Sequence, residues 1–196
     1  MFLLQMSGLP GAGKSTVAAY VAATFGAISV DYDVIKTAVL DAGFDVPASS
    51  KAAYEVMYGQ AGHILAQGHD VVMDSPCFYP RILTRGLEIA QQHNATYRYI
   101  ECQVNDLQLL DDRLTQRPRL RSHRRSINQP PPDLGDELVD GETSFRDWAD
   151  RVQRPPADYL QLDMQRPLTD VLPEVDAYIA AGRADLTVTR GAATTP

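Results

Sequence analysis

The feature that most constrains the fold is the glycine-rich stretch MSGLPGAGKST at residues 6–16, which directly follows an apolar start. Residues 2–6 form a short, continuous apolar run, as expected of a buried central strand. After the glycines, Val17, Tyr20, Val21 and Phe25 follow helical spacing, and Gly26 ends the pattern. The chain is therefore expected to begin as a strand, a glycine loop and a helix over residues 14–25.

Residues 8–15 fit the pattern G-x-x-x-x-G-K-[ST], which is the P-loop. The backbone of such a loop curls so that its N–H groups face a triphosphate, and side chains at the turns would obstruct that approach. Lys14 is expected to reach the β- and γ-phosphates as a catalytic group, and Ser15 to ligate Mg²⁺. The predicted cofactors are ATP, with GTP not excluded, and Mg²⁺. The predicted nucleotide-binding residues are Gly8, Leu9, Pro10, Gly11, Ala12, Gly13, Lys14, Ser15 and Thr16.

Further strands and helices alternate along the chain. Strands are expected at 27–31, 70–75, 96–104 and 158–164, and helices at 33–43, from 49 or 50 to 69, at 81–94, 105–117, around 144–152, and at 167–182. This order predicts an α/β fold, a doubly wound parallel sheet of about five strands with helices on both faces. We expect one domain over residues 1–182 and a frayed tail over 183–196.

Composition excludes several classes of protein. The net charge of -7 argues against a surface that coats nucleic acid. The two cysteines are too few for a disulfide framework, and they lack metal-ligand spacing with the histidines. No signal peptide is recognisable, and no apolar run approaches the ~18 residues of a membrane span. We expect a cytoplasmic protein without a membrane partner, and the sequence leaves its oligomeric state open.

Two aspartates follow predicted strands on the edge that carries the glycine loop. Asp74 ends the strand at 70–75 and is expected to hold Mg²⁺ through water, the alternative being a cap of the following turn. Asp33 is the candidate general base for an acceptor hydroxyl, and Asp31 is a less favoured substitute. The alternative for Asp33 is N-capping of the next helix. Lys36 either binds the acceptor or is solvated.

Six arginines without an acidic neighbour lie within thirteen residues, from Arg113 to Arg125. Arg113 and Arg117 are four residues apart, so both can point from one helix face toward the phosphates as catalytic groups. We expect them to belong to a mobile lid over about residues 113–141. The alternative is a solvated basic loop that pairs with the acidic residues at 133–142.

The order of these parts resembles the small P-loop kinases often labelled AAA-family ATPases. The shared parts are GLPGAGKST, VDYDVIK, VVMDSP and LLDDRLTQR with the basic segment after it, and the likeness covers about residues 1–180. The group includes polynucleotide 5′-kinases, zeta-toxin-like kinases and chloramphenicol phosphotransferase. The resemblance implies that Asp33 is the base and that Arg113 or Arg117 is the lid arginine. Polynucleotide kinases carry Asp-Asp-x-Arg where this chain has Asp33-Val-Ile-Lys36, which makes nucleic acid a less favoured acceptor.

The predicted function is a kinase that phosphorylates a hydroxyl of a small molecule, such as a nucleoside, a sugar or an antibiotic-like compound. Tyr54 and Tyr58 are candidates for contacts with a cyclic acceptor, the alternative being core packing. Arg154 is a candidate for flanking the purine. The alternatives in function are a polynucleotide 5′-hydroxyl kinase and a nucleotide-dependent switch that recruits a partner.

Overall fold

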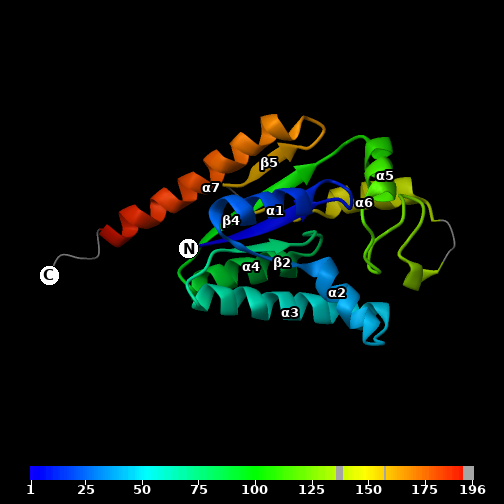
Figure 1. Cartoon of the computed structure of the whole chain (residues 1–196), viewed down its shortest axis with the longest axis horizontal. Helices are drawn as coiled ribbons and strands as arrows, with labels where there is room; N and C mark the ends of the chain where they lie inside the picture. The colour runs from blue at the N-terminus through cyan, green and yellow to red at the C-terminus, as the bar shows by residue number, and fades with distance from the viewer. Residues whose placement is uncertain (136–138, 157, 192–196) are drawn as a thin grey trace.

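The structure, a computed structural model, describes residues 1–135, 139–156 and 158–191. Within these residues a five-stranded parallel sheet has the order β2-β3-β1-β4-β5 (Figure 1). The strands are β1 (Phe2–Gly8), β2 (Ile28–Asp31), β3 (Val71–Asp74), β4 (Thr96–Gln103) and β5 (Leu160–Asp163). The helices are α1 (Lys14–Phe25), α2 (Tyr32–Asp41), α3 (Val46–Ala66), α4 (Pro80–Gln92), α5 (Leu107–Gln116), α6 (Gly141–Arg151) and α7 (Leu168–Gly191). The predicted α/β class and parallel sheet are confirmed.

The sheet is covered on both faces because its central strand is apolar on both sides. Leu4 and Met6 of β1 pack in one cluster with residues of α1, α5, α6 and α7. Leu3 packs in a second cluster with residues of α3 and α4. Figure 1 shows α3 and α4 on one side of the sheet and α1 and α7 on the other. In such a sheet the crevice lies at the carboxyl ends of the parallel strands. The loop that follows β1 therefore lies in this crevice.

In its described residues the segment between α5 and α6 has one short 3-10 turn, Pro132–Leu134, and it contacts α2. Arg121 pairs with Asp41 of α2 at 3.0 Å and with Asp133 at 2.6 Å. The second pair is the basic-to-acidic pairing that the sequence offered as the alternative to a lid. The movement of this segment as a lid stays a prediction.

Several predicted helix ends are wrong, and three of them have a clear physical cause. The cap of α2 is Asp31 and not Asp33, since the carboxylate of Asp31 accepts the N–H of Asp33. Helix α3 begins at Val46, because Asp45 caps it by accepting the N–H of Ala48 at 2.8 Å.

The third wrong end is that of α7, which continues past Gly182 to Gly191. A Cβ atom on Gly182 would collide with the guanidinium of Arg98, so this glycine permits a close approach and does not end the helix. The last part of the predicted tail, residues 192–196, lies outside the described residues. None of the described helices combines the length and the apolar character that a membrane crossing needs.

Candidate active site

The glycine loop between β1 and α1 has the backbone that the motif predicts. Gly8, Gly11 and Gly13 have φ angles of 129°, 84° and 94°, which L side chains rarely adopt. A Cβ atom on Gly8 would collide with the carbonyl oxygen of Cys102, and one on Gly13 would lie 2.9 Å from Cε of Met164. The loop is therefore pressed against β4 and the segment after β5, and only glycine fits at these turns.

Lys14 lies at the centre of the site. Its Nζ donates to the carbonyl oxygens of Gly8 at 3.1 Å and Leu9 at 3.0 Å. Burial lowers the pKa of Lys14, while the charges of Asp74 and Asp33 act in the opposite direction. Helix α1 begins at this residue, and the first N–H groups of a helix have no partner within it. The loop thus places a cation next to the N-terminus of a helix, and together they suit a phosphate group.

Two carboxylates lie side by side at the ends of β2 and β3, where Asp31 is in register with Asp74. Burial raises the pKa of Asp74 to about 6, although the charge of Lys14 and a hydrogen bond from Ser15 oppose that shift. Burial and the neighbouring charge of Asp33 also raise the pKa of Asp31.

Ser15 and Asp74 fit a magnesium site. Ser15 is near enough to lower the pKa of Asp74, and the two side chains supply the oxygen ligands that Mg²⁺ prefers. Within the described residues no group of three His, Cys, Asp or Glu side chains could hold a metal alone. Mg²⁺ is commonly held by one or two protein ligands together with phosphate oxygens and water, so this donor set is sufficient when a nucleotide is bound.

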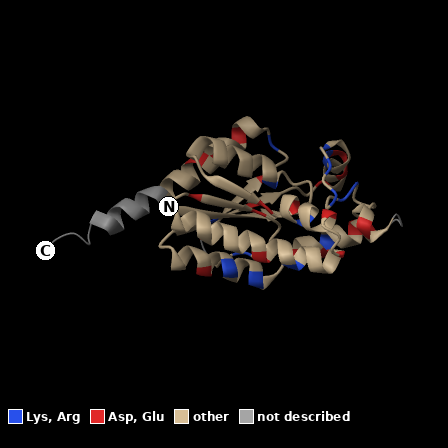
Figure 2. Ribbon diagram, turned by 60° about the horizontal axis from the view of Figure 1, so that its bottom comes forward, with Lys and Arg blue, Asp and Glu red and all other residues tan. Residues whose placement is uncertain are grey.

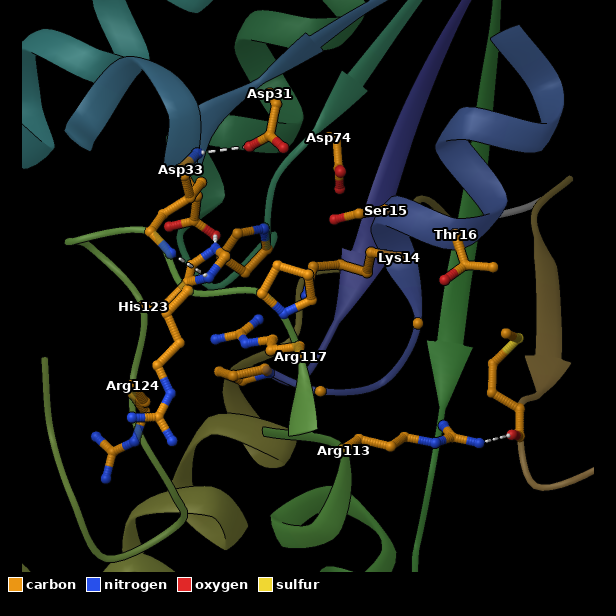
Figure 3. Close-up of a pocket in the computed structure, with 18 of the residues that line it drawn as sticks. Lys14, Ser15, Thr16, Asp31, Asp33, Asp74, Arg113, Arg117, His123 and Arg124 are labelled. Atoms are coloured by element: carbon orange, nitrogen blue, oxygen red, sulfur yellow. Dashed lines mark hydrogen bonds and ion pairs between the residues drawn. The ribbon is translucent and has the colours of Figure 1, made fainter. Parts of the chain in front are cut away.

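Asp33 projects its carboxylate into the site because Asp31 performs the capping that the sequence offered as its alternative role (Figure 3). Its Oδ1 accepts a hydrogen bond from Oγ of Ser122 at 3.1 Å. Its Oδ2 lies 3.5 Å from Nε2 of His123. Burial acts to raise the pKa of Asp33, but His123, Lys14 and Ser122 outweigh it and hold the pKa below its usual value. The carboxylate of Asp33 is therefore held in place and ionised.

His123 is a site residue that the sequence analysis missed. The N–H of Leu120 donates to its Nδ1 at 3.2 Å, which leaves the proton of the neutral ring on Nε2, facing Asp33. Nothing local in the sequence marks this histidine, because its partner is on α2 and the two meet only through the packing of the segment after α5.

The two predicted catalytic arginines lie in different parts of the site. Arg117 is half-buried, and its Nε has no hydrogen-bond partner among the described residues. Burial lowers the pKa of Arg117, while the charges of Asp33 and Asp31 raise it. Arg113 instead donates from Nη2 to the carbonyl oxygen of Met164 at 2.7 Å, and Figure 3 shows it extended away from Asp33.

One cavity of about 840 Å³ joins these groups. Three parts of the chain line it. The glycine loop and the start of α1 contribute Pro10, Gly11, Gly13, Lys14, Ser15 and Thr16, and the ends of β2 and β3 with the start of α2 contribute Asp31, Asp33 and Asp74. Helix α5 and the basic segment after it contribute Arg113, Arg117, Arg119, Ser122, His123 and Arg124. This volume lies in the range of about 300–1,000 Å³ that small-molecule sites occupy. The glycine loop and the carboxylates therefore face one shared space.

Comparison with known protein families shows which family the chain belongs to. A family model described as an AAA domain matches residues 3–129. The chain belongs to this AAA domain family. No curated protein matches the sequence significantly.

Several solved structures share the fold of this AAA domain. A gluconokinase from Sinorhizobium meliloti 1021 has a TM-score of 0.62 and 14% identity over 96% of this chain and 97% of its own. A sugar kinase from Janibacter sp. HTCC2649 has a TM-score of 0.61 and 11% identity, with coverage of 92% and 95%. An APS kinase from Mycobacterium tuberculosis in complex with AMPPNP and APS has a TM-score of 0.59 and 15% identity, with coverage of 91% and 97%. The fold is therefore that of the P-loop kinases.

Some predicted site residues of the AAA domain do not line the cavity. Gly8, Leu9 and Ala12 belong to the loop, but Leu9 and Ala12 are part of the core. Arg154 is paired with Glu101 of β4 at 2.6 Å and 2.7 Å and is not part of the cavity lining, so its position beside a purine stays a prediction without support from the structure.

The remaining predicted acceptor contacts also lie elsewhere in the described part of the chain. Tyr54 stacks against Tyr32 and Tyr58, with ring centroids 4.3 Å and 6.1 Å away, so both predicted tyrosines pack in the core beneath α2. The Nζ of Lys36 lies 5.9 Å from the ring centre of Tyr32, outside the cavity lining. The core alternative holds for the tyrosines in this structure.

Proposed function

We propose that this chain is an ATP- and Mg²⁺-dependent kinase that transfers the γ-phosphate to a hydroxyl group of a small molecule. The observation that carries the proposal is the position of Asp33. Its carboxylate faces the same cavity as Lys14, is held by two side-chain donors and has no capping role. A phosphate-binding loop that only senses a nucleotide has no need of such a group.

The proposed reaction is an in-line displacement at the γ-phosphorus. The acceptor oxygen forms a bond to phosphorus and gives its proton to Asp33, while the bond between phosphorus and the β-phosphate oxygen breaks and ADP leaves. Lys14 and Arg117 neutralise charge on the transferring group and the leaving oxygen. Arg117 suits this role because it is half-buried and lacks a carboxylate at ion-pair distance within the described residues.

Ser15 and Asp74 are the residues that we expect to hold Mg²⁺. When bound, the ion would supply positive charge that neutralises the phosphates. Ser15 lies in the first turn of α1 and Asp74 at the end of β3, and both line the cavity beside the phosphate-binding loop.

We place the nucleobase at the end of the cavity formed by Thr16, Arg113, Met164, Arg166 and Leu168. This group combines apolar side chains with two guanidinium planes, which can stack on a purine. Arg113 is fixed there by its bond to the carbonyl of Met164, and Arg166 by an ion pair with Glu174 at 2.6 Å. The similar APS kinase was solved with AMPPNP, which supports ATP as the donor.

The first test is ³¹P NMR of the protein with Mg²⁺ and ATP and with pooled acceptors. The pool contains nucleosides, sugars, sugar acids, phenolic antibiotics and a 5′-hydroxyl oligonucleotide. We expect a new phosphoester resonance that is absent with Lys14→Ala. Intact ATP, or inorganic phosphate alone with every acceptor, would refute the kinase. Phosphorylation of the oligonucleotide alone would replace the small-molecule acceptor with a polynucleotide.

A further inference from the structure

Arg124 lies on the acceptor side of the cavity. It lines the same space as Asp33 and directly follows His123, and Figure 3 shows it beyond His123, away from Lys14. The ribbon in Figure 2 marks positions of Lys and Arg along α5 and the segment that follows it. Since Lys14 and Arg117 already serve the nucleotide phosphates, Arg124 needs another explanation.

The guanidinium of Arg124 is held in place by neutral groups. Its centre lies 5.1 Å from the ring centre of Trp148 and 5.6 Å from that of Phe145. Its Nε donates to the carbonyl of Ser126 at 3.4 Å, and its Nη2 donates to the carbonyl of Ile127. An arginine fixed in this way loses little conformational entropy when it binds a ligand.

Arg124, like Arg117, has no acidic partner among the described residues. Arg121, Arg154 and Arg166 are each paired with a carboxylate at 3.0 Å or less. No described carboxylate lies within ion-pair distance of Arg124, although its side chain is half-buried and burial lowers its pKa. A partly desolvated cation without a counter-ion is costly, and it is a feature of sites that receive an anion.

We propose that the phosphate acceptor carries an anionic group in addition to its reacting hydroxyl, and that Arg124 binds this group. The inference rests on the proposed kinase function and names its substrate class: hydroxy acids, sugar acids or phosphate monoesters. The planar fork of the guanidinium matches the two oxygens of a carboxylate or phosphate. When its anionic group is bound at Arg124, a small acceptor can reach Asp33 with its other end, because both residues line the same cavity.

The test compares acceptors in pairs that differ only in the acidic group. The pairs are glycerate with glycerol, gluconate with glucitol, and glucose 6-phosphate with glucose, and each is assayed with Mg²⁺ and ATP. We expect the acid of at least one pair to be phosphorylated with a kcat/KM about 10- to 100-fold above its neutral partner. Equal or better turnover of the neutral partners would overturn the inference while leaving the kinase intact. A 5′-hydroxyl oligonucleotide as the sole acceptor would assign Arg124 to a nucleic-acid phosphate and overturn the small-molecule class.

Variants of Arg124 separate ligand binding from a structural role. Arg124→Gln is expected to raise KM for the acidic acceptor about 10- to 100-fold, with KM for ATP unchanged, and Arg124→Lys to restore part of the loss. Arg146→Gln, on the exposed face of α6, is the matched control. A loss that falls equally on kcat for acidic and neutral acceptors would mean that Arg124 only holds the segment to α6. Binding of the preferred acid to Asp33→Asn with Mg²⁺ and ADP, measured by calorimetry, provides a readout that needs no turnover.

Discussion

Nε2 of His123 faces Oδ2 of Asp33 at 3.5 Å, and its Nδ1 accepts the N–H of Leu120. The relationship joins the first turn of α2 to the basic segment after α5. Ser122 adds a second tie, since its Oγ lies 3.1 Å from both the carboxylate and the carbonyl oxygen of Asp33. The orientation of the proposed base therefore depends on a segment that is distant in sequence, and the packing of that segment and the ionisation of Asp33 are coupled.

The first prediction concerns the pH dependence of catalysis. The pKa of Asp33 is lowered because His123, Lys14 and Ser122 outweigh burial, so removal of His123 leaves burial less opposed. In His123→Ala the pKa of Asp33 rises, and the acidic limb of the kcat/KM profile moves to higher pH. The profile of His63→Gln, an exposed residue of α3, should match the wild type. An acidic limb that stays in place in His123→Ala would remove His123 from the site.

The second prediction distinguishes a kinase from a nucleotide switch. Asp33→Asn retains the size of the side chain and removes its ability to take a proton, so we expect kcat to fall about 10²- to 10⁴-fold. Binding of ATP, measured by calorimetry, should change little, because the phosphates contact the glycine loop. Transfer at near the wild-type rate would contradict the role of Asp33. If the wild type transfers no phosphate but binds a partner in a nucleotide-dependent way, a regulatory protein would be favoured.

The glycine loop, the sheet and most helices could be predicted because their signals are local. Glycines at fixed spacing, apolar runs and helical periodicity each lie within about twenty residues of chain. Helix caps were less certain, since Asp31 and Asp33 are both good caps and only the geometry selects Asp31. That selection leaves the carboxylate of Asp33 facing the cavity.

Contacts between distant segments could not be predicted. Arg154 is neutralised by Glu101, which belongs to a strand that precedes it by three elements, and no pattern in the sequence pairs them. The role of His123 has the same origin. Tyr54 and Tyr58 have the spacing of a buried helix face. That face packs in the core against the sheet and does not line the acceptor pocket.

The third prediction concerns the loop glycines. Gly8→Ala forces a side chain onto a residue with φ of 129° and toward the carbonyl oxygen of Cys102. Gly26 also has a positive φ, 69°, but nothing lies within 4 Å of a Cβ atom there. We expect Gly26→Ala to cost about 1–2 kcal/mol of unfolding free energy from the backbone alone, and Gly8→Ala to cost more. Urea unfolding measures the loss of unfolding free energy in both variants, and the difference between them gives the cost of the clash with Cys102. Equal losses would show that β4 shifts to accept the new side chain.

The fourth prediction concerns stability in the absence of nucleotide and metal. Burial raises the pKa of Asp74 to about 6, so the folded protein binds a proton in a pH range where the unfolded chain does not. The wild type should therefore gain stability relative to Asp74→Asn as the pH falls from about 7.5 to about 5. Thermal unfolding of both proteins in EDTA measures the difference. A pH-independent difference would place the pKa of Asp74 in the ordinary range of a carboxyl.

The last prediction separates the two arginines that the sequence left as alternatives. Arg117 has a half-buried guanidinium near Asp33, with no hydrogen-bond partner for Nε in the described chain, whereas Arg113 is bonded to Met164 beside the proposed nucleobase site. Arg117→Ala should lower kcat about 10²- to 10³-fold and leave KM for ATP nearly unchanged, because its charge acts on the transferring phosphoryl group. Arg113→Ala should instead raise KM for ATP, since it removes a contact made equally in the ground and transition states. Steady-state kinetics of both variants decide the assignment, and the opposite pattern would exchange the two roles.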